Sequence, residues 1–162
     1  MAEQLFFRVA QETDLQAVLA LYHSVLGNTF CTWNEEYPGS FEIEEDTKTG
    51  NLFLLLDGDS IIGAISIVPV NEMDAFIEWN LKNNVAEFAR VVISPAWQGK
   101  GLAGLLVDHV LEEMKNRAYK AVHISIAKVN TPALKTYLKK GFVLVGEKEM
   151  YGNRYYLAEK AI

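Results

Sequence analysis

A glycine-rich segment, Gln98-Gly99-Lys100-Gly101-Leu102-Ala103-Gly104, is the clearest candidate for chemistry in the sequence. It follows a predicted strand over 85–93 and begins a stretch in which apolar residues recur at helical spacing. Glycines in a strand-to-helix turn can present backbone N–H groups, together with the positive end of the helix, to an anionic group. The segment is therefore a candidate pyrophosphate site, and a turn whose glycines only permit close packing is the alternative.

The glycines of this segment also match the G-x-G-x-x-G pattern of dinucleotide-binding folds. That pattern requires the glycines directly after the strand and a carboxylate at the end of the next strand. Here residues 95–98 come between strand and glycines, and the next predicted strand, 121–127, is followed by Lys128. The G-x-x-x-x-G-K-[ST] phosphate loop also fails, because Lys100 is followed by glycine. A nicotinamide-dependent oxidoreductase is therefore disfavoured.

The elements that would position this segment follow from the spacing of apolar residues and from turn residues. Strands are predicted over 5–9, 52–56, 61–68, 85–93, 121–127, 142–150 and 154–158. Helices are predicted over 15–26, 102–117 and 131–140, with a short helix candidate at 42–46. Thr13 followed by Gln16 predicts a capping box for the first helix. Alternation within 85–93 predicts that one strand face carries Glu87, Ala89, Val91 and Ile93.

Composition and charge narrow the class of protein. The chain has 162 residues, of which 50% are hydrophobic and 22% charged, as is typical of a soluble globular domain. We therefore expect a single domain over 1–162. The net charge of −6 argues against a nucleic-acid partner, because such partners are bound by clustered Lys and Arg.

The sequence also bears on location and on metal binding. The longest nearly uninterrupted apolar run, 61–70, is about half of the roughly 20 residues that cross a bilayer. The polar start of the chain does not resemble a secretory signal, so we expect a cytoplasmic protein without a membrane partner. Cys31 is the only cysteine and the three histidines lie far apart, so neither a disulfide nor a metal site is expected.

Two segments together resemble the signatures of a known family. The first runs from Glu87 to Ala103 and contains Gln98-x-x-Gly101-x-Ala103. The second is Asn130-Thr131-Pro132-Ala133-Leu134-Lys135-Thr136-Tyr137-Leu138-Lys139-Lys140-Gly141-Phe142. With the order of the predicted elements, these segments resemble the GCN5-related N-acetyltransferase (GNAT) family across nearly the whole chain.

The resemblance implies an α/β (α+β) fold of one domain. Its mixed central sheet would have about six to seven strands, with helices on both faces and a splay between two parallel strands. The resemblance also implies acetyl-CoA as co-substrate, without a metal, and direct attack by an amine in a ternary complex. The residues implied to hold acetyl-CoA are Val91, Val92, Ile93, Gln98, Gly99, Lys100, Gly101, Leu102, Ala103, Gly104, Asn130 and Tyr137.

Two catalytic roles follow once this chemistry is assumed. The resemblance places Tyr137 near the thioester sulfur, where its phenol could protonate the departing thiolate, although a core tyrosine fits the spacing equally well. An ammonium must lose a proton before it attacks, and Glu87 is the candidate base because a desolvated carboxylate has a raised pKa. The alternative for Glu87 is a salt bridge with a residue such as Arg90, and the alternative for Asn130 is a helix N-cap.

The acceptor is the least determined part of the prediction. Trp33, Glu35 and Tyr37 are candidates for an amine pocket, because aromatic rings and carboxylates bind cations. A second predicted loop, 71–84, supplies either the opposite wall or a homodimer contact through Phe76, Glu78 and Trp79. The leading hypothesis is transfer of an acetyl group to a primary amine of a small molecule. A protein or peptide acceptor, and a non-catalytic acyl-CoA sensing module, are the alternatives.

Overall fold

The computed structural model describes residues 4–162 of the chain. Over these residues, seven strands form one sheet in the order β1-β2-β3-β4-β5-β7-β6. The strands are β1 (Leu5–Val9), β2 (Leu52–Asp57), β3 (Ser60–Val68), β4 (Val85–Ile93), β5 (Ala121–Ala127), β6 (Val143–Met150) and β7 (Asn153–Ala161). Neighbouring strands are antiparallel except β4 and β5, which are parallel, so the expected mixed sheet is confirmed.

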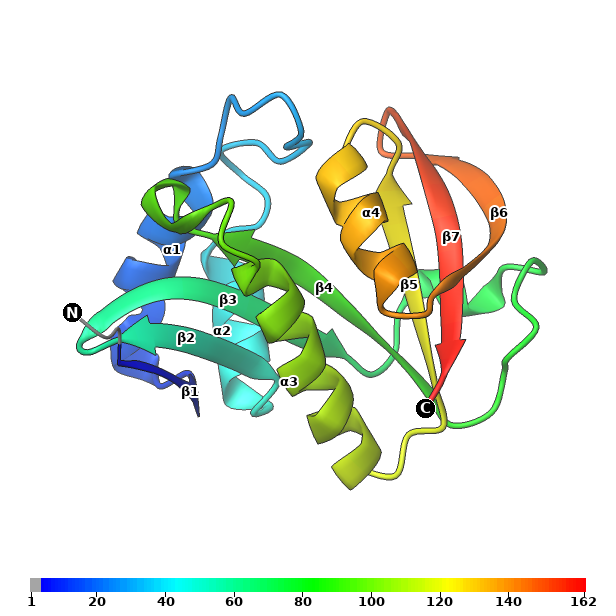
Figure 1. Ribbon diagram of the computed structural model, residues 1–162, viewed down its shortest axis with the longest axis horizontal. Coiled ribbons are helices and arrows are strands. Elements are labelled where there is room, and N and C mark those ends of the chain that lie inside the picture. The colour runs from blue at the N-terminus through cyan, green and yellow to red at the C-terminus, as the bar shows by residue number, and fades with distance from the viewer. Residues whose placement is uncertain (1–3) are drawn as a thin grey trace.

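Helices cover both faces of the sheet (Figure 1). On one face, α1 (Leu15–His23) and α2 (Ser40–Lys48) bury apolar side chains against β2 and β3. On the other face, α3 (Leu102–Asn116) and α4 (Thr131–Lys139) pack over the middle of the sheet. Short 3-10 turns occupy Glu12–Asp14, Glu72–Ala75 and Pro95–Trp97. The arrangement confirms the expected layers.

The start of the first helix differs from the expectation. The predicted capping box of Thr13 does not form; instead the carboxylate of Asp14 accepts the backbone N–H of Gln11 at 2.7 Å. Arg8 of β1 fixes that carboxylate, since its guanidinium donates two hydrogen bonds of 2.7 and 2.9 Å to it. The Asp14 carboxylate thus ties the start of the 3-10 turn before α1 to β1. The helix also ends at His23, earlier than predicted.

The parallel strands β4 and β5 pair over only a short stretch. The paired residues are Val85–Glu87 with Ala121–His123. Beyond them the two strands diverge, which Figure 1 shows as a V that opens away from the C-terminus. On its β5 side, the backbone of β4 beyond Glu87 therefore has no strand partner, and its N–H and C=O groups there are available to another molecule.

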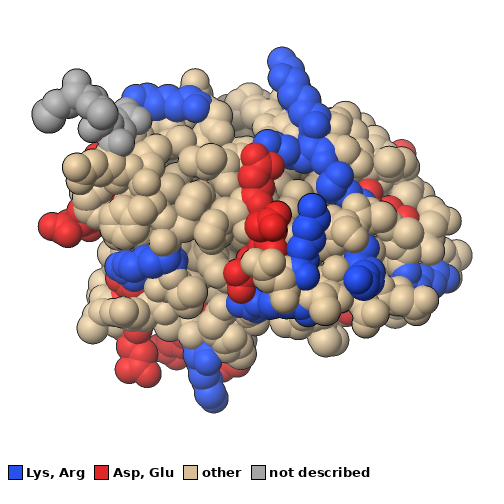
Figure 2. Space-filling model, turned by 60° about the horizontal axis from the view of Figure 1, so that its bottom comes forward, with Lys and Arg blue, Asp and Glu red and all other residues tan. Residues whose placement is uncertain are grey.

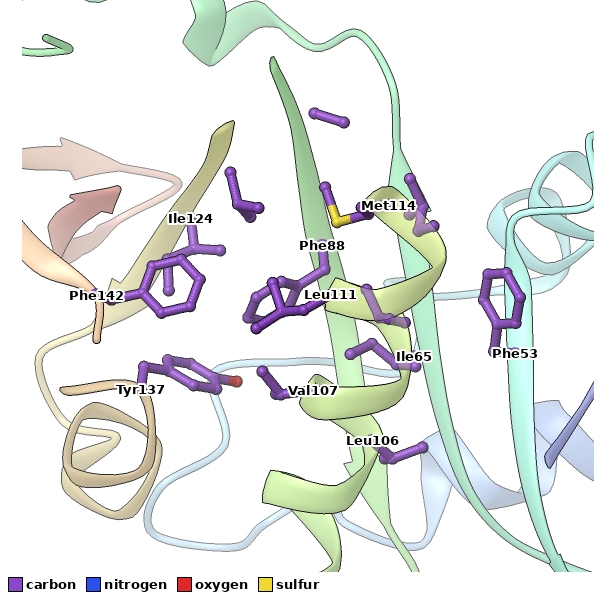
Figure 3. Close-up of a cluster of buried hydrophobic side chains, with 14 of the residues drawn as sticks. Phe53, Ile65, Phe88, Leu106, Val107, Leu111, Met114, Ile124, Tyr137 and Phe142 are labelled. Carbon is purple, nitrogen blue, oxygen red and sulfur yellow. The ribbon is translucent and has the colours of Figure 1, made fainter. Parts of the chain in front are cut away.

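An aromatic cluster holds the two sides of the splay together where strand pairing has ended. Phe88 of β4 makes edge contacts with Tyr137 of α4, at a ring distance of 5.4 Å, and with Phe142, at 5.7 Å. Figure 3 shows these rings side by side between β4 and β5. Such pairs contribute about 0.5–1.5 kcal/mol each beyond their buried area. The position of α4 relative to β4 is thus set by packing.

The connection 71–84 is anchored to the sheet although it has little regular structure. Trp79 is 2% exposed, stacks on His123 of β5 at a ring distance of 3.8 Å, and donates its indole N–H to the carbonyl of Met73 at 2.8 Å. His123 in turn contacts the carbonyl of Leu81 at 2.6 Å. These contacts hold the connection against the edge of the splay.

Two surface properties complete the description. No helix within residues 4–162 is long and apolar enough to cross a membrane. On the face shown in Figure 2, acidic side chains lie between groups of basic ones, so the basic groups there do not form an uninterrupted surface. Lys140 forms an ion pair with Asp108 of α3 at 2.8 Å.

Candidate active site at the splay between β4 and β5

A cavity of about 1100 Å³ fills the space where β4 and β5 diverge. It is large enough for a substantial ligand, since small-molecule pockets usually have volumes of about 300–1,000 Å³. Its walls include all of 87–93 in β4, 125–127 in β5, the strand-to-helix loop, the start of α4, parts of 25–37, the segment 71–73, and Tyr151, Asn153 and Tyr155. Regions from the whole length of the chain therefore meet at this one place.

The strand-to-helix loop brings free backbone donors to one end of the cavity. Gly99 and Gly101 both have a φ of 78°, a left-handed conformation that residues with a side chain adopt at a cost. Gly101 is the N-cap of α3, and no side chain of the described part of the chain caps this end of the helix. The first N–H groups of α3 thus lack intrahelical acceptors and, with the helix dipole, form an anion site.

The residues predicted to hold acetyl-CoA are gathered here with one exception. All of them line the cavity except Lys100, whose ammonium lies 5.0 Å from the centre of the Trp97 ring. The amide of Gln98 donates to the carbonyl of Ile93 at 3.0 Å and so fixes the loop to the end of β4. Asn130 accepts the N–H of Ala133 at 3.2 Å, so it is an N-cap of α4 as well as a cavity residue.

Tyr137 is both a core residue and a residue of the cavity wall. Its ring is buried in the aromatic cluster, with 8% of its surface exposed, and it lines the cavity. In Figure 3 its hydroxyl points away from α4 toward Val107 of α3. Burial raises the pKa of the phenol. The phenol is therefore protonated at neutral pH, which is the state that a general acid requires.

Glu87 is a buried carboxylic acid with no polar partner among residues 4–162. Glu87 is 8% exposed and lines the cavity. Its carboxylate makes no hydrogen bond or ion pair with any residue that the structure describes. Burial raises the pKa of this carboxyl to about 8, with a smaller rise from the charge of Asp74 and an opposing effect of Arg90. The alternative, a salt bridge between Glu87 and Arg90, is not formed. The guanidinium of Arg90 pairs with Asp46 at 2.9 Å instead.

A bulge in β4 changes which residues share a face. At Arg90 and Val91, two residues of β4 lie opposite a single residue of β3. As a result, Phe88 and Ile93 both pack in the core beneath α3, although an odd number of positions separates them. The expectation that the odd-numbered residues from Glu87 to Ile93 share one face is therefore wrong.

Glu87 and α3 lie on opposite sides of the sheet. Because neighbouring residues of a strand point to opposite faces, Glu87 points away from the α3 face that receives Phe88. The helix N-terminus of α3 and the carboxylate of Glu87 thus reach the cavity from opposite sides of the sheet. A donor and an acceptor that enter from the two faces would meet in the splay.

Two of the three residues predicted for the acceptor pocket line the cavity. Trp33 and Tyr37 line the cavity, whereas Glu35 is exposed and is not one of the lining residues. Trp33 contacts the ring of Tyr22 edge-on at 5.4 Å, and Tyr37 accepts a hydrogen bond of 3.2 Å from Arg90. The predicted aromatic segment therefore contributes rings rather than a carboxylate.

The opposite wall is formed by residues that the sequence did not single out. Phe76, Glu78 and Trp79 do not line the cavity; Glu78 instead pairs with Lys148 of β6 at 2.8 Å. Their places are taken by Asn71, Glu72, Met73 and, from the turn after β6, Tyr151. The hydroxyl of Tyr151 donates to the carboxylate of Glu72. No periodicity in the sequence marks these residues. They lie in two connections, and the fold of the whole chain brings these connections together.

Comparison with known proteins identifies the class of this site. A model of the acetyltransferase (GNAT) family matches residues 17–142. The chain belongs to the GNAT family. It is therefore an acyltransferase, and the resemblance found in its two sequence signatures is confirmed.

Relatives of this GNAT protein match it in sequence or in fold over nearly their whole length. YwnH of Bacillus subtilis (strain 168), which is named a "putative phosphinothricin acetyltransferase", is 29% identical over 91% of this chain and 92% of its own. An N-acetyltransferase of Staphylococcus aureus Mu50 has a TM-score of 0.77 at 20% identity, with 98% of each chain covered. yncA of Salmonella typhimurium, whose structure holds its cofactor acetyl-CoA, has a TM-score of 0.77 at 16% identity, with 98% and 94% covered.

Proposed function

We propose that residues 1–162 act as one N-acetyltransferase domain, which transfers the acetyl group of acetyl-CoA to a primary amine of a small molecule. One observation supports this most directly: a single cavity has an uncapped helix N-terminus at one end and the buried, unpartnered Glu87 at the other. The first feature suits a pyrophosphate and the second suits removal of a proton from an ammonium.

The residues around the loop fit the coenzyme. The N–H groups of 101–104 would bind the pyrophosphate, and the unpaired edge of β4 at Val91 and Ile93 would pair with the pantetheine arm as an added strand. Asn130 would contact the same arm from the start of α4. Bound acetyl-CoA supplies the acyl group as a thioester that an amine can attack.

The proton transfers are assigned to two side chains. Glu87 takes a proton from the acceptor ammonium, and the free amine then attacks the thioester carbonyl within the ternary complex. The C–N bond forms as the C–S bond breaks, while backbone N–H groups of β4 stabilise the negative charge that develops on the acyl oxygen. Tyr137 gives its phenolic proton to the departing thiolate, so that CoA leaves as a thiol.

The charges of the cavity favour a cationic acceptor. Among the described residues that line it, the acids are Glu72 and Glu87, and the one Lys or Arg is Arg90. The charge of Arg90 is already balanced by Asp46. With Trp33 nearby, the acceptor end offers carboxylates and an aromatic ring, which suit an amine that carries a positive charge.

The test is release of free thiol from acetyl-CoA across a panel of acceptors. The panel contains polyamines, aminoglycosides, amino acids, peptides and, because of the name given to YwnH, phosphinothricin. We expect turnover with one small-molecule class and an approximately 100-fold lower kcat for Tyr137→Phe, with unchanged coenzyme affinity by calorimetry. Tyr119→Phe is the matched control, because Tyr119 packs against the same core but does not line the cavity.

Two results would contradict the proposal. Tight coenzyme binding without thiol release from any acceptor would favour a sensing module, and turnover with peptides alone would replace the small-molecule acceptor. A Tyr137→Phe enzyme as fast as wild type would reject only the role of the phenol.

A further inference from the structure

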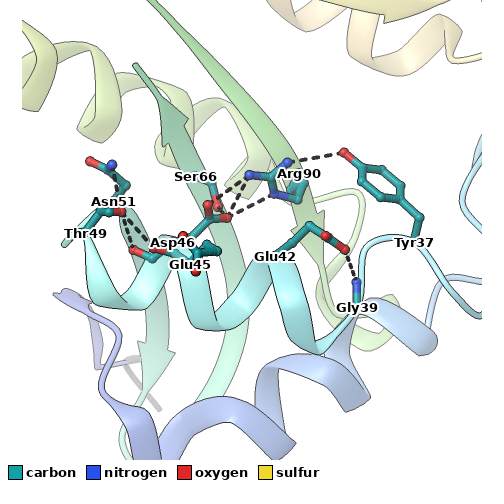
Figure 4. Close-up of polar contacts among 9 residues, drawn as sticks. All are labelled: Tyr37, Gly39, Glu42, Glu45, Asp46, Thr49, Asn51, Ser66 and Arg90. Atoms are coloured by element: carbon teal, nitrogen blue, oxygen red, sulfur yellow. Dashed lines mark hydrogen bonds and ion pairs between the residues drawn. The ribbon is translucent and has the colours of Figure 1, made fainter. Parts of the chain in front are cut away.

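A buried polar cluster joins α2 to the bulge of β4 (Figure 4). The carboxylate of Asp46 in α2 accepts three hydrogen bonds of 2.9–3.0 Å from the Arg90 guanidinium. It also accepts the hydroxyl of Ser66 in β3 at 2.7 Å. The two charged side chains are only 12% and 11% exposed. Charge-assisted, two-pronged contacts of this kind fix the orientation of a guanidinium.

Asp46 bridges the two strands at the point where their register shifts. Ser66 is paired with Ala89, directly before the bulge, and Arg90 is the first bulged residue. Arg90 has a φ of 54°, which is uncommon for a residue with a long side chain and is retained only where its surroundings impose it. The contacts of Asp46 with both strands provide that restraint.

Arg90 shares the cavity with Glu87, three residues earlier on the same strand. The other titratable groups around Glu87 are His123, its register partner on β5, Asp74 and Glu72 from the 71–75 segment, and Tyr151. Arg90 is the strong cation near Glu87 and these groups. Its charge already acts on the carboxyl of Glu87, because it lowers the pKa of that group against the effect of burial.

We propose that Asp46 is a positioning residue, which holds the Arg90 guanidinium against α2 and so keeps it from pairing with Glu87 in the cavity. The inference rests on the proposed role of Glu87 as the base. Without Asp46, the guanidinium has an unpartnered carboxylate within the same cavity, and an ion pair with it would occupy the oxygen that must take the proton. The same loss would release the β4 bulge that presents backbone groups to the acyl oxygen.

The experiment compares Asp46→Asn with Asp14→Asn. Asp14 is a matched control, because it is also 8% exposed and also binds an arginine, Arg8, through two hydrogen bonds, but it does not line the cavity. We expect Asp46→Asn to lower the kcat plateau about 10-fold and to move the acid limb of the pH–kcat profile down by about one unit or more. Asp14→Asn should lower thermal stability and leave the position of the limb unchanged.

A second variant separates sequestration of Arg90 from general damage to the fold. In Asp46→Asn/Arg90→Asn the competing cation is gone, and asparagine tolerates a positive φ better than most residues. We expect its acid limb to return to the wild-type position or to lie at higher pH. Arg90→Asn alone should also raise the limb, because the guanidinium lowers the pKa of Glu87 in the wild type. If Asp46→Asn does not fold by circular dichroism, the test is whether the double variant and Arg90→Asn share one limb, because Asp46 is proposed to act only through Arg90.

Several outcomes would overturn the inference. These are an unmoved acid limb in Asp46→Asn, an acceptor KM that rises while the limb stays in place, or a double variant whose limb remains as low as that of the single variant. Glu87→Gln is measured in parallel. If it keeps the wild-type limb, the proposed base is wrong; if it loses the limb while Asp46→Asn does not move it, only the role of Asp46 fails.

Discussion

Glu87 and Glu159 are two buried glutamates that lie in one row across the sheet. Each is a register partner of His123, Glu87 from β4 on one side and Glu159 from β7 on the other. Their exposed fractions are similar, 8% and 5%. The carboxylate of Glu159 accepts the backbone N–H of Asn80 at 2.8 Å and that of Leu81 at 3.2 Å. The carboxylate of Glu87 has no such donor among the described residues.

Burial alone therefore does not make a carboxylate reactive. Backbone donors satisfy Glu159, and in exchange the carboxylate ties the 71–84 connection to β7, which is a structural role. Glu87 has no hydrogen-bond donor among the described residues, and the charge of Arg90 offsets its desolvation only in part, so the pKa of its carboxyl rises to about 8. A base with a pKa near the working pH is well matched to proton transfer, and such unsatisfied groups concentrate at functional sites.

The largest effect that separates the two glutamates is on catalysis. We expect Glu87→Gln to lower kcat/KM about 100-fold or more and to abolish the acid limb near pH 8, because the amide cannot take a proton. Glu159→Gln should keep the limb. Both profiles are measured with one acceptor, whose own ionisation then cancels in the comparison. An acid limb that survives in Glu87→Gln would show that the two glutamates do not differ in this way.

The second difference concerns the free energy of unfolding, which substitution by glutamine should change in opposite directions at Glu87 and at Glu159. A carboxyl whose pKa is raised on folding keeps its proton where the unfolded chain has lost it, so wild-type stability falls as the pH rises from 4.5 to about 8. Glu87→Gln removes this loss and should be more stable than wild type at pH 9, by on the order of 5 kcal/mol, with no gain below pH 4. Glu159→Gln should instead be destabilised by roughly 1–3 kcal/mol, because its NH2 group cannot accept a backbone N–H.

Urea unfolding at pH 4, 7 and 9 measures both changes. A Glu87→Gln variant whose stability relative to wild type is the same at all three pH values would mean that this carboxyl is not protonated in the folded protein. Its environment would then resemble that of Glu159 more closely than the structure indicates.

The sequence predicted those parts of the fold that depend on local pattern. Alternating apolar residues located β4 and β5, and the strands predicted over 52–56 and 61–68 correspond to β2 and β3. Glycine spacing marked the loop before α3, since a left-handed φ at Gly99 and Gly101 is a local requirement. For the same reason, nearly all the residues predicted to bind the coenzyme line one cavity.

The parts that were missed depend on contacts between distant segments. The bulge at Arg90 reversed the expected faces of β4, and it is accompanied by a contact with Asp46, which lies 44 positions away. Glu72 and Tyr151 form a wall of the cavity although 79 positions separate them. Glu35 has the right chemistry for a cation site but lies on an exposed turn outside the cavity. Such placements follow from the packing of whole elements, which periodicity does not encode.

Asp74 is expected to have a small effect on the pKa of the Glu87 carboxyl. Asp74 raises the pKa of that carboxyl through its negative charge, but its side chain is 40% exposed and solvent weakens the interaction. Asp74→Asn should therefore move the acid limb to lower pH by about 0.3–0.5 unit, and its amide oxygen can still accept the N–H of Asn71. Asp59→Asn, the same charge change at the exposed β2–β3 turn, should not move the limb. A limb that stays in place or rises in Asp74→Asn would leave desolvation as the one cause of the contrast with Glu159.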